Sequence, residues 1–460
     1  MISTPLRKLD TLADTLSSLT PNDDLQRYCQ DASGLTASGK PALVLRPRNT
    51  AEVSEIVCAC HHEGRSLTIQ GGRTGMAGAA VPNAGDVVLS LEHMNRIEAL
   101  DTLGGTVTVQ AGVILEALCR QVEEQGWYFP LDCGARGSCQ IGGNIATNAG
   151  GNRVLRYGTM RELVLGLEVV LADGTVLSMM NKGLKNNTGL DLKHLFIGTE
   201  GTLGIITRAV LRLFPKPDRR DSALVALDSF DQLTSLLKAA RAHLPSLSSF
   251  EVMWNNYLQA AARVLHKPAP FDGAYALYVL IETEGMESGT TRHELEAFLS
   301  GLIDTGLARD VILPQTHEQA AQLWKLRDAI GEILLTMQPY VAFDVGIPLH
   351  ELPGFIERVT ARLTQTWPQA QNLLFGHLGD GNLHLSTGPH AQSDLYAVES
   401  TVYQEVERVG GSISAEHGIG RIKKPFLHHS RSADELALMA DIKRLLDGDE
   451  LLNRQRLLDL

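Results

Sequence analysis

The stretch from Phe375 to Leu385 constrains the fold most, because it joins strong turn residues to apolar flanks. It reads Phe-Gly-His-Leu-Gly-Asp-Gly-Asn-Leu-His-Leu, and its Asp380-Gly-Asn382 centre is typical of a β-hairpin turn. A four-residue loop over 379–382 would place His377 directly opposite His384, with their Cβ atoms roughly 4.5–5.5 Å apart. We therefore expect two imidazoles close enough to share one metal ion.

A second segment offers an acidic partner for this histidine pair. The run from Ser412 to Gly420 carries Glu416 and His417 where a short apolar stretch meets glycines. Adjacent residues of an extended segment point to opposite sides, so Glu416 could complete a metal site while His417 faces another part of the same pocket. The alternative is two structural histidines and a solvated glutamate. The combination of a histidine pair with a Glu-His dipeptide favours the functional interpretation.

Composition limits the classes of protein that need to be considered. A chain of 460 residues with 44% hydrophobic and 20% charged residues is expected to form two or three soluble domains. The net charge of −12 argues against a nucleic-acid partner. There is no long apolar run for a membrane span and no secretory signal, so we expect a cytoplasmic protein, with peripheral membrane association left open. All six cysteines lie in the first third, and we expect reduced structural thiols.

The first half alternates short strands with glycine-rich loops. A helical lead-in over 6–18 precedes a strand over 42–46, a helix that starts near Thr50 and a strand over 66–70, which together predict a β-α-β unit. The loop 71–82 follows, with four glycines that let backbone N–H groups approach an anion. Its spacing fits neither the Rossmann fingerprint nor the Walker A loop.

Two further glycine-rich segments strengthen this signal. The first covers 130–152 and the second covers 198–206, which runs into a strand over 205–214. Between the loop 71–82 and the loop 130–152 we expect strands over 86–91 and 106–111 and a helix over 113–124. Such dense glycine suits backbone packed against a flat polar ligand better than an apolar core.

The second half predicts an α+β arrangement, with an antiparallel sheet covered by helices on one face. The expected strands are 222–227, 250–253, 274–282 and 340–345, and the expected helices are 230–243, 257–264, 290–302, 318–335, 352–364, 394–409 and 434–446. Pro215-Lys-Pro217 indicates a boundary. We divide the chain into 1–217, 218–400 with the histidine hairpin, and a C-terminal helical segment 401–460.

Together these motifs resemble the vanillyl-alcohol oxidase/p-cresol methylhydroxylase flavoprotein superfamily. The residues that carry the resemblance are Gly71-Gly-Arg-Thr-Gly75, Ile141-Gly-Gly-Asn-Ile-Ala-Thr-Asn-Ala-Gly-Gly151, Gly198-Thr-Glu-Gly-Thr-Leu-Gly204, Gly376–His384 and Glu416-His-Gly-Ile-Gly420. The likeness covers roughly residues 35–460 and is greatest to FAD-dependent D-2-hydroxyacid dehydrogenases of the D-lactate, D-2-hydroxyglutarate and glycolate types. It implies a two-subdomain FAD-binding domain and an α+β substrate (cap) domain with an antiparallel sheet.

The resemblance also implies how the cofactor is held. The histidine that some relatives use for covalent attachment is replaced by Arg73 and Thr74, so non-covalent FAD is expected. The implied cofactor-binding residues are Gly71, Gly72, Arg73, Thr74, Gly75, Gly78 and Ala79 in the first loop, Pro130, Gly142, Gly143, Asn144, Thr147, Asn148 and Gly150 in the second, Gly204 and Ile205 in the third, and Asn453 in the tail.

The resemblance further implies a metal-assisted oxidation. His377, His384 and Glu416 would hold Zn²⁺ or Mn²⁺, and the cation would lower the pKa of the substrate hydroxyl. His417 would take the proton as base, and the C2 hydrogen would pass as hydride to flavin N5. Arg327, on a predicted helix with Trp324, matches the family's anion-binding arginine. Its ordinary alternative is a surface ion pair with Asp328 or Glu332.

Several positions depart from the pattern of the 2-hydroxyglutarate enzymes. Gly331 replaces a hydroxyl residue, Ala342 replaces a lysine, and Ser386 replaces an asparagine at a substrate position. Loss of the lysine disfavours a dicarboxylate, because a second buried carboxylate without a charged partner is costly. We therefore expect a 2-hydroxy monocarboxylate or an acid with an apolar tail.

Two other classes of function remain open from the sequence. Two histidines and a glutamate also suit a metal-dependent hydrolase, although this leaves the glycine loops unexplained. A flavin-binding subunit without turnover is the second alternative. The electron acceptor (oxygen, a quinone, a cytochrome or an electron-transfer flavoprotein) and a homodimeric state are not decided by the residues.

Overall fold

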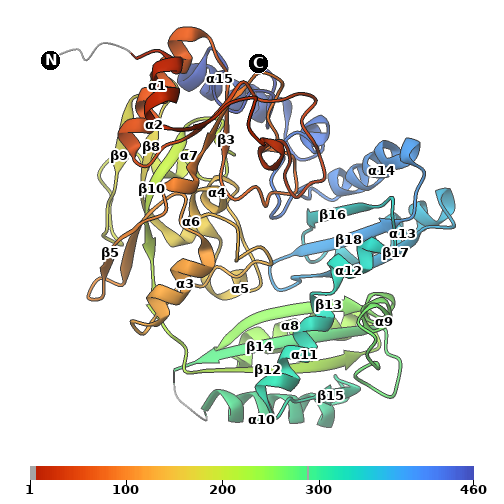
Figure 1. Cartoon of the computed structure of the whole chain (residues 1–460). Helices are drawn as coiled ribbons and strands as arrows, with labels where there is room; N and C mark the ends of the chain where they lie inside the picture. Colours follow the sequence, from red (N-terminus) through yellow and green to blue (C-terminus); the bar gives the residue numbers. More distant parts are fainter. Residues whose placement is uncertain (1–6, 287–289) are drawn as a thin grey trace. The chain divides into compact units, whose positions relative to one another are not determined.

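A computed structural model describes residues 7–286 and 290–460, with the side chains of residues 290 and 291 excepted (Figure 1). The chain divides into two compact units. The first unit contains the chain up to Gly151, residues 158–216 and residues 416–460, and the second contains residues 152–157 and 217–415. The second unit thus runs past the expected limit at residue 400, and the expected segment 401–460 is divided after Ala415.

The first unit contains a small, partly parallel sheet. In spatial order its strands are β1 (Ser17–Leu19), β2 (Leu43–Arg46), β4 (Val87–Ser90) and β3 (Leu67–Gln70). Helix α2 (Thr50–Glu63) joins β2 to β3, yet both strands pair in parallel with β4, which lies between them. The N-cap of α2 is Asn49, whose side chain accepts from the Glu52 N–H, so the cap lies one residue before Thr50.

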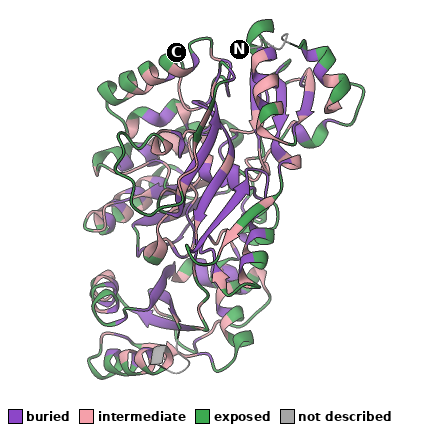
Figure 2. Cartoon of the chain, turned by 90° about the vertical axis from the view of Figure 1, so that its left-hand side faces the viewer, coloured by how far each residue is buried: buried purple, intermediate pink, exposed green. Residues whose placement is uncertain are grey.

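The larger sheet of this unit is antiparallel. Its strands are β5 (Ile97–Asp101), β6 (Thr106–Gln110), β10 (Ile205–Arg212), β8 (Val164–Val170) and β9 (Val176–Met179). Two further long helices of this unit are α3 (Leu115–Glu123) and α15 (Ala433–Asp447). The centres of the strands are buried while the outer faces of the helices are exposed (Figure 2).

The second unit is built on one seven-stranded antiparallel sheet, which confirms the predicted sheet type. Its strands are, in order, β15 (Asp310–Ile312), β12 (Arg219–Leu227), β14 (Leu277–Gly285), β13 (Leu247–Trp254), β17 (Gln371–Gly376), β18 (Asn382–Gly388) and β16 (Val341–Gly346). Its long helices are α8 (Phe230–His243), α9 (Asn255–Val264), α10 (Thr290–Asp304), α11 (His317–Arg327), α13 (Leu352–Thr366) and α14 (Leu395–Arg408).

One face of this sheet is covered by α9, α11 and the short α12 (Ile330–Leu335). Tyr257 of α9 is fully buried, and its ring stacks on Phe375 of β17 with centroids 4.5 Å apart. The structure divides the expected helix 318–335 at Asp328, which follows the last residue of α11 and is not helical. Arg327 therefore ends a helix that lies over the sheet (Figure 1).

The short segment 152–157 is held to the second unit by buried charges. Arg153 donates to Glu282 and Glu284 at the end of β14, at 2.9 Å in both cases. Arg220 donates to the same Glu284 at 2.7 Å. Arg153 and the two acids are buried and would be costly to bury alone, so each requires the others, while the more exposed Arg220 adds a second partner for Glu284.

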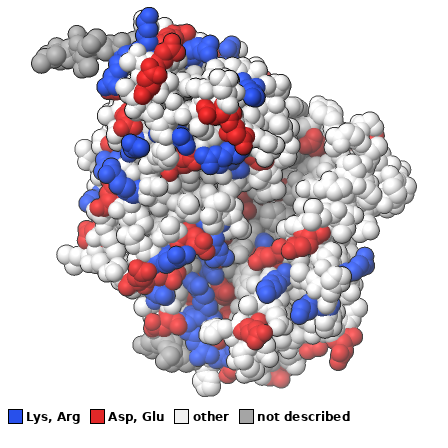
Figure 3. All heavy atoms as spheres, in the orientation of Figure 1, with Lys and Arg blue, Asp and Glu red and all other residues white. Residues whose placement is uncertain are grey.

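Surface charges of both signs are mixed. Figure 3 shows Lys and Arg side chains interspersed with Asp and Glu over the visible face. No helix in the described ranges is both long and apolar enough to cross a membrane.

Candidate active site

The histidine hairpin forms, but its register differs from the prediction. Strand β17 ends at Gly376 and β18 begins at Asn382, so the connection has five residues, and Phe375 rather than His377 lies opposite His384. The carbonyl of His377 accepts from the N–H groups of Asp380 and Asn382, which closes the loop one residue earlier than expected. The predicted direct pairing of His377 with His384 is therefore wrong. The two rings still meet, with centroids 5.3 Å apart, because both lie on the same face of the sheet.

His377 is held by a buried acid that the sequence analysis missed. The pairs Val252–Gly376 and Met253–Phe375 set the register of β13 and β17, which brings Glu251 next to His377. His377 Nδ1 lies 2.8 Å from Glu251 Oε1, and the Glu251 side chain is only 1% exposed. A lone acid inside the apolar strand 247–254 was the signal that could have revealed it.

Arg327 shares this acid. Its Nε donates to Glu251 Oε2 at 2.8 Å, its Nη1 lies 3.2 Å from Asp328 Oδ1, and its Nη2 lies 3.0 Å from His377 Nε2. The arginine is buried, so the alternative of a surface ion pair accounts only for its contact with Asp328. Burial alone would lower the pKa of Arg327, but the Glu251 and Asp328 carboxylates raise it above its ordinary value.

The same neighbours shift the pKa values of two carboxyl groups. Burial alone would raise the pKa of Glu251, yet the charges of His377 and Arg327 lower it below its ordinary value. Asp380 in the hairpin loop behaves differently: burial raises its pKa to about 6, against the opposing effect of His377. Burial thus outweighs the charge of His377 and raises the pKa of Asp380, whereas the two cationic neighbours of Glu251 lower its pKa.

His384 sits in the middle of three strands. It pairs with Phe375 on β17 and with Asp344 on β16, and its ring centroid lies 4.7 Å from that of Phe375. Its Nδ1 lies 3.9 Å from Asp344 Oδ1. The ring is therefore fixed from both sides of β18.

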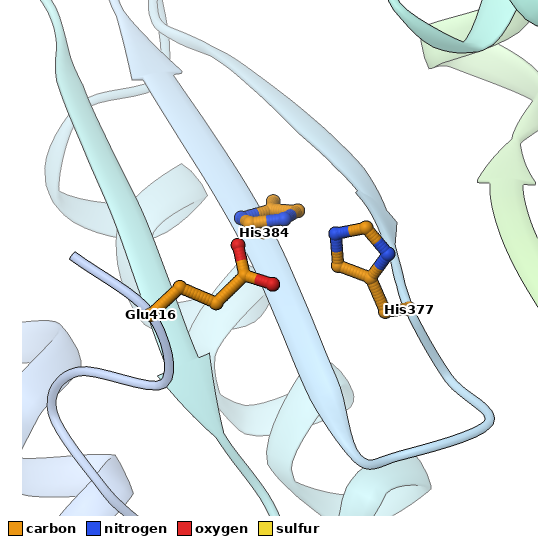
Figure 4. Close-up of side chains that lie close together, drawn as sticks. All are labelled: His377, His384 and Glu416. Atoms are coloured by element: carbon orange, nitrogen blue, oxygen red, sulfur yellow. The ribbon is translucent and has the colours of Figure 1, made fainter. Parts of the chain in front are cut away.

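Glu416 is brought to the histidines by its own chain neighbours. The Ala415 N–H donates to the Asp344 carbonyl at 3.1 Å, and Gly346 and Ser412 form an antiparallel bridge. Ligand atoms of His377, His384 and Glu416 all lie within 4.8 Å of one another (Figure 4). Donors of one zinc ion at 2.0–2.2 Å lie at most about 4.4 Å apart, so this set fits a divalent cation after a small side-chain adjustment. The structure thus brings together the three predicted ligands.

Three more side chains lie on the same face of β16 and β18. Ser386, two residues after His384, is buried opposite Ala342. Asn382, two residues before His384, is 5% exposed, and neither polar atom of its side chain has a hydrogen-bond partner in the described part of the chain. A buried amide without a partner is expensive, so Asn382 indicates a polar ligand beside the histidines.

The glycine loops of the first unit pack tightly on one another. A Cβ on Gly72 would lie 2.1 Å from the Ser138 carbonyl oxygen, and one on Gly142 would lie 2.6 Å from Ala111 Cβ. Part of the second predicted loop is a helix, α4 (Ile141–Ala146). In the third loop a Cβ on Gly204 would lie 2.5 Å from Val169 Cγ1. These glycines are required by the protein's own packing.

Other glycines border open space. A Cβ on Gly75 or Gly143 would meet no protein atom within 4 Å. Gln140 is buried, and its Oε1 has no hydrogen-bond partner in the described ranges. Open space lined by glycine backbone, beside a buried acceptor that lacks a donor, fits a flat polar group such as a flavin nucleotide.

The C-terminal segment ties these loops together. Glu200 of the third loop accepts from the N–H groups of Ile419 and Gly420, at 2.7 and 2.8 Å, and burial raises its pKa. Asn453 accepts from the Ile69 N–H and donates to the Glu200 carbonyl. Asn453, predicted as a cofactor contact, thus uses its side chain to hold β3 to the third loop. No local pattern in the sequence pointed to Glu200.

The remaining predicted residues follow this framework. Arg73 has a positive φ of 56°, and its guanidinium lies over the Tyr28 ring at 5.1 Å, so its backbone rather than its side chain is available to a ligand. Asn148 also has a positive φ, and its Oδ1 accepts from Thr159 and from the Arg161 N–H. Gly71, Thr74, Gly78 and Ala79 follow β3; Pro130, Asn144, Thr147 and Gly150 lie in or beside the second loop; Ile205 begins β10; and His417 follows Glu416.

Comparison with known proteins identifies both parts of the chain. Residues 41–179 match the family described as "FAD binding domain", and residues 216–457 match "FAD linked oxidases, C-terminal domain". A D-2-hydroxyglutarate dehydrogenase of Xanthomonas citri pv. viticola is 41% identical over 444 residues, which cover 95% of this chain and 93% of the relative. The mitochondrial D-2-hydroxyglutarate dehydrogenase of Bos taurus is 42% identical over 427 residues, which cover 92% of this chain and 78% of the relative.

The fold has a solved counterpart. p-Cresol methylhydroxylase with bound substrate superposes with a TM-score of 0.77 at 17% identity, and the alignment covers 98% of this chain and 96% of that one. At this identity the comparison establishes the fold alone, and it confirms the predicted architecture.

Proposed function

Because this chain belongs to the FAD-linked oxidases of the vanillyl-alcohol oxidase/p-cresol methylhydroxylase family, we propose that it oxidises a D-2-hydroxy acid to the 2-oxo acid. The relatives named as D-2-hydroxyglutarate dehydrogenases match more than nine-tenths of the chain. The single observation that carries the proposal is the clustering of His377, His384 and Glu416 in such a protein. A 2-hydroxy acid offers a hydroxyl and a carboxylate that can bind one cation together.

FAD, when bound, supplies the acceptor for the hydride that leaves C2 of the substrate. The residues proposed to hold it are the backbone of the first loop (Gly71, Gly72, Arg73, Thr74, Gly75, Gly78 and Ala79), the second loop (Pro130, Gly142, Gly143, Asn144, Thr147, Asn148 and Gly150) and the end of the third loop, where it enters β10 (Gly204 and Ile205). With Arg73 and Thr74 at the position of covalent attachment, the cofactor is bound non-covalently. Asn453 acts here by holding the loops.

A divalent cation, Zn²⁺ or Mn²⁺, would lower the pKa of the substrate hydroxyl when it is held by the two histidines and Glu416. His417 then accepts the hydroxyl proton, as the general base. Ser386 and Arg327 offer a hydroxyl and a guanidinium to the substrate carboxylate. Since Glu251 already balances the charge of Arg327, this arginine contributes directed N–H groups more than net charge.

The length of the substrate is the finer part of the proposal. The named relatives favour a dicarboxylate, whereas Ala342 and Gly331 remove a cation and a hydroxyl from positions where the 2-hydroxyglutarate pattern has them. We retain the monocarboxylate, with an apolar tail as the variant, because the strands beside His384 supply no second cation: β16 and β18 contain neither lysine nor arginine.

The test is anaerobic bleaching of the flavin by D- and L-forms of lactate and 2-hydroxyglutarate, with and without a chelator. We expect bleaching by a D-acid, and we expect chelator to stop it. Bleaching by L-acids alone would refute the stereochemistry, and bleaching that survives chelation would refute the metal. A colourless preparation that hydrolyses esters would instead favour the metal-dependent hydrolase.

The partner that reoxidises the flavin also belongs to the proposal. We propose a quinone, a cytochrome or an electron-transfer flavoprotein, reached by a homodimeric cytoplasmic protein that associates at most peripherally with a membrane. Mixing the substrate-reduced protein with each acceptor, and with oxygen, ranks them by the rate at which flavin absorbance returns.

A further inference from the structure

The carboxylate of Glu251 makes two contacts, one through each of its oxygens. Its Oε1 lies 2.8 Å from His377 Nδ1, and its Oε2 accepts from Arg327 Nε at 2.8 Å. The Glu251 side chain is 1% exposed, so solvent does not weaken either contact by screening. An ionised carboxylate can accept at both oxygens at once.

The first contact determines which nitrogen of His377 carries the proton. A carboxylate only accepts, so Nδ1 must be the donor, and in the neutral imidazole the lone pair is then on Nε2. Nε2 is the atom left to bind a cation. A carboxylate behind a metal-ligating histidine fixes both the tautomer and the ring orientation in this way.

We propose that Glu251 is a positioning residue that directs the Nε2 lone pair of His377 toward the metal site and orients the guanidinium of Arg327. The inference rests on the proposed function, since it presumes that His377 is a metal ligand. Arg327 Nη2 lies 3.0 Å from Nε2 and 3.3 Å from Nδ1, so it lies over the imidazole ring rather than along the Nε2 lone pair. A cation that binds this lone pair therefore does not need to displace the guanidinium, and Arg327 Nε stays bonded to Glu251.

The chemistry of an amide makes this testable. In Glu251→Gln one oxygen remains, and the N–H donors of His377 and Arg327 compete for it. When this oxygen accepts from Arg327, the amide NH₂ faces His377 Nδ1. Nδ1 must then accept a hydrogen bond, and the ring proton moves to Nε2. That tautomer does not bind a cation.

The measurement is the Zn²⁺ affinity of the FAD-loaded protein, obtained by competition with a chromogenic chelator. We expect Glu251→Gln to weaken zinc binding about 10–100-fold. Glu284→Gln is the matched control, because Glu284 is also buried and accepts from two arginines, Arg153 and Arg220, without a contact to His377. The control should bind zinc within about twofold of the wild type, because this site is untouched.

A double variant separates positioning from general damage. When Glu251→Gln is combined with Arg327→Leu, no guanidinium competes, so the side-chain amide oxygen at position 251 accepts from Nδ1 and zinc affinity recovers toward the wild type. The inference is overturned if Glu251→Gln binds zinc normally, if both Glu→Gln variants lose affinity equally, or if the double variant shows no recovery. If the wild type binds zinc no better than His377→Ala, the metal part of the proposed function fails as well. The two failures are thereby distinguished.

Discussion

At the scale of single residues, a variant of His417 tests whether proton transfer can be lost while metal binding is kept. It follows Glu416, the proposed metal ligand, in a short segment, and its imidazole is the proposed base. We expect His417→Asn to reduce kcat by about 10²–10⁴-fold, the usual contribution of a general base. FAD content and Zn²⁺ affinity should stay unchanged, as absorbance and chelator competition would show. A variant that loses zinc together with activity would make His417 a ligand instead.

Ala342 tests the length of the substrate. It lies opposite Ser386, two residues before Asp344, which pairs with His384, so a longer side chain there would add its charge to the row that carries His384. We expect Ala342→Lys to raise kcat/KM for D-2-hydroxyglutarate relative to D-lactate by about tenfold or more, since a hydrogen bond to a charged group contributes about 1.5–3 kcal/mol.

Ala342→Met is the control for side-chain length. It adds apolar bulk without charge and should not favour the dicarboxylate. An equal gain with Met would show that volume, not the cation, selects the substrate.

At the scale of elements, helix α4 and the first glycine loop border the space assigned to FAD. A Cβ on Gly143 meets no described atom within 4 Å outside its own helix backbone and chain neighbours, and alanine is the better helix former, so Gly143→Ala should not lower the thermal stability of the FAD-free protein. The added methyl group should nevertheless weaken FAD binding, by about tenfold or more, because overpacking against a ligand costs about 1–3 kcal/mol. FAD titration followed by flavin fluorescence measures this.

Gly301 in α10 provides the comparison. A Cβ there also meets nothing within 4 Å, and the residue lies in the other unit. Gly301→Ala should leave FAD affinity unchanged. Equal FAD affinity in the wild type, Gly143→Ala and Gly301→Ala would show that the flavin does not fill the space beside Gly143.

Helices α13 and α14 are joined by a buried acid whose effect depends on pH. Glu405 accepts from Arg358 at 3.0 Å and Arg362 at 2.8 Å. Burial alone would raise the pKa of Glu405, but the arginines lower it below its ordinary value of 4.5. Its stabilisation is therefore present above pH 4.5 and is lost as the pH falls through the lower, folded-state pKa.

Glu405→Gln should accordingly reduce the free energy of unfolding at pH 7 by about 1–3 kcal/mol. The difference from the wild type should shrink steadily below pH 4.5. Urea unfolding at several pH values measures it, and a difference that is the same at pH 7 and pH 3.5 would contradict the ion-pair account.

Elements with a clear periodicity were predictable from the sequence, and pairings were not. The prediction for α8 matches residue for residue, because a capping Ser229 precedes a regular apolar stripe. The strands β5, β8 and β9 were missed, since they lie between glycine-rich segments that read as loops. The register of the hairpin was wrong because turn length, which a single sequence does not fix, decides it.

The site shows the same division. His377, His384 and Glu416 were found because their side chains have distinctive chemistry. Glu251 was missed because only the register of β13 and β17 brings it to His377. An acid inside an apolar strand marks Glu251 as unusual, but that local signal does not say which residue it contacts.

At the scale of the whole molecule, the two proposed ligands depend on different parts of the chain. The glycine loops belong to the first unit, whereas His377 and His384 belong to the second. Glu416 begins the segment that returns to the first unit, but the hydrogen bond from Ala415 to Asp344 fixes its neighbour to β16. The two ligands are therefore proposed to bind largely different residues of the chain.

We expect this division to make the two ligands separable. Dialysis against a chelator should remove the cation and stop bleaching by a D-2-hydroxy acid, while the FAD-to-protein ratio and the flavin spectrum stay the same. Removal of FAD should conversely leave Zn²⁺ affinity within about threefold, because His377 and His384 are held by β13, β16 and β17 rather than by the loops. Metal analysis and absorbance on the same samples measure both. Flavin that leaves with the metal would mean that the cation supports the loops themselves, since a ligand stabilises only the structure that binds it.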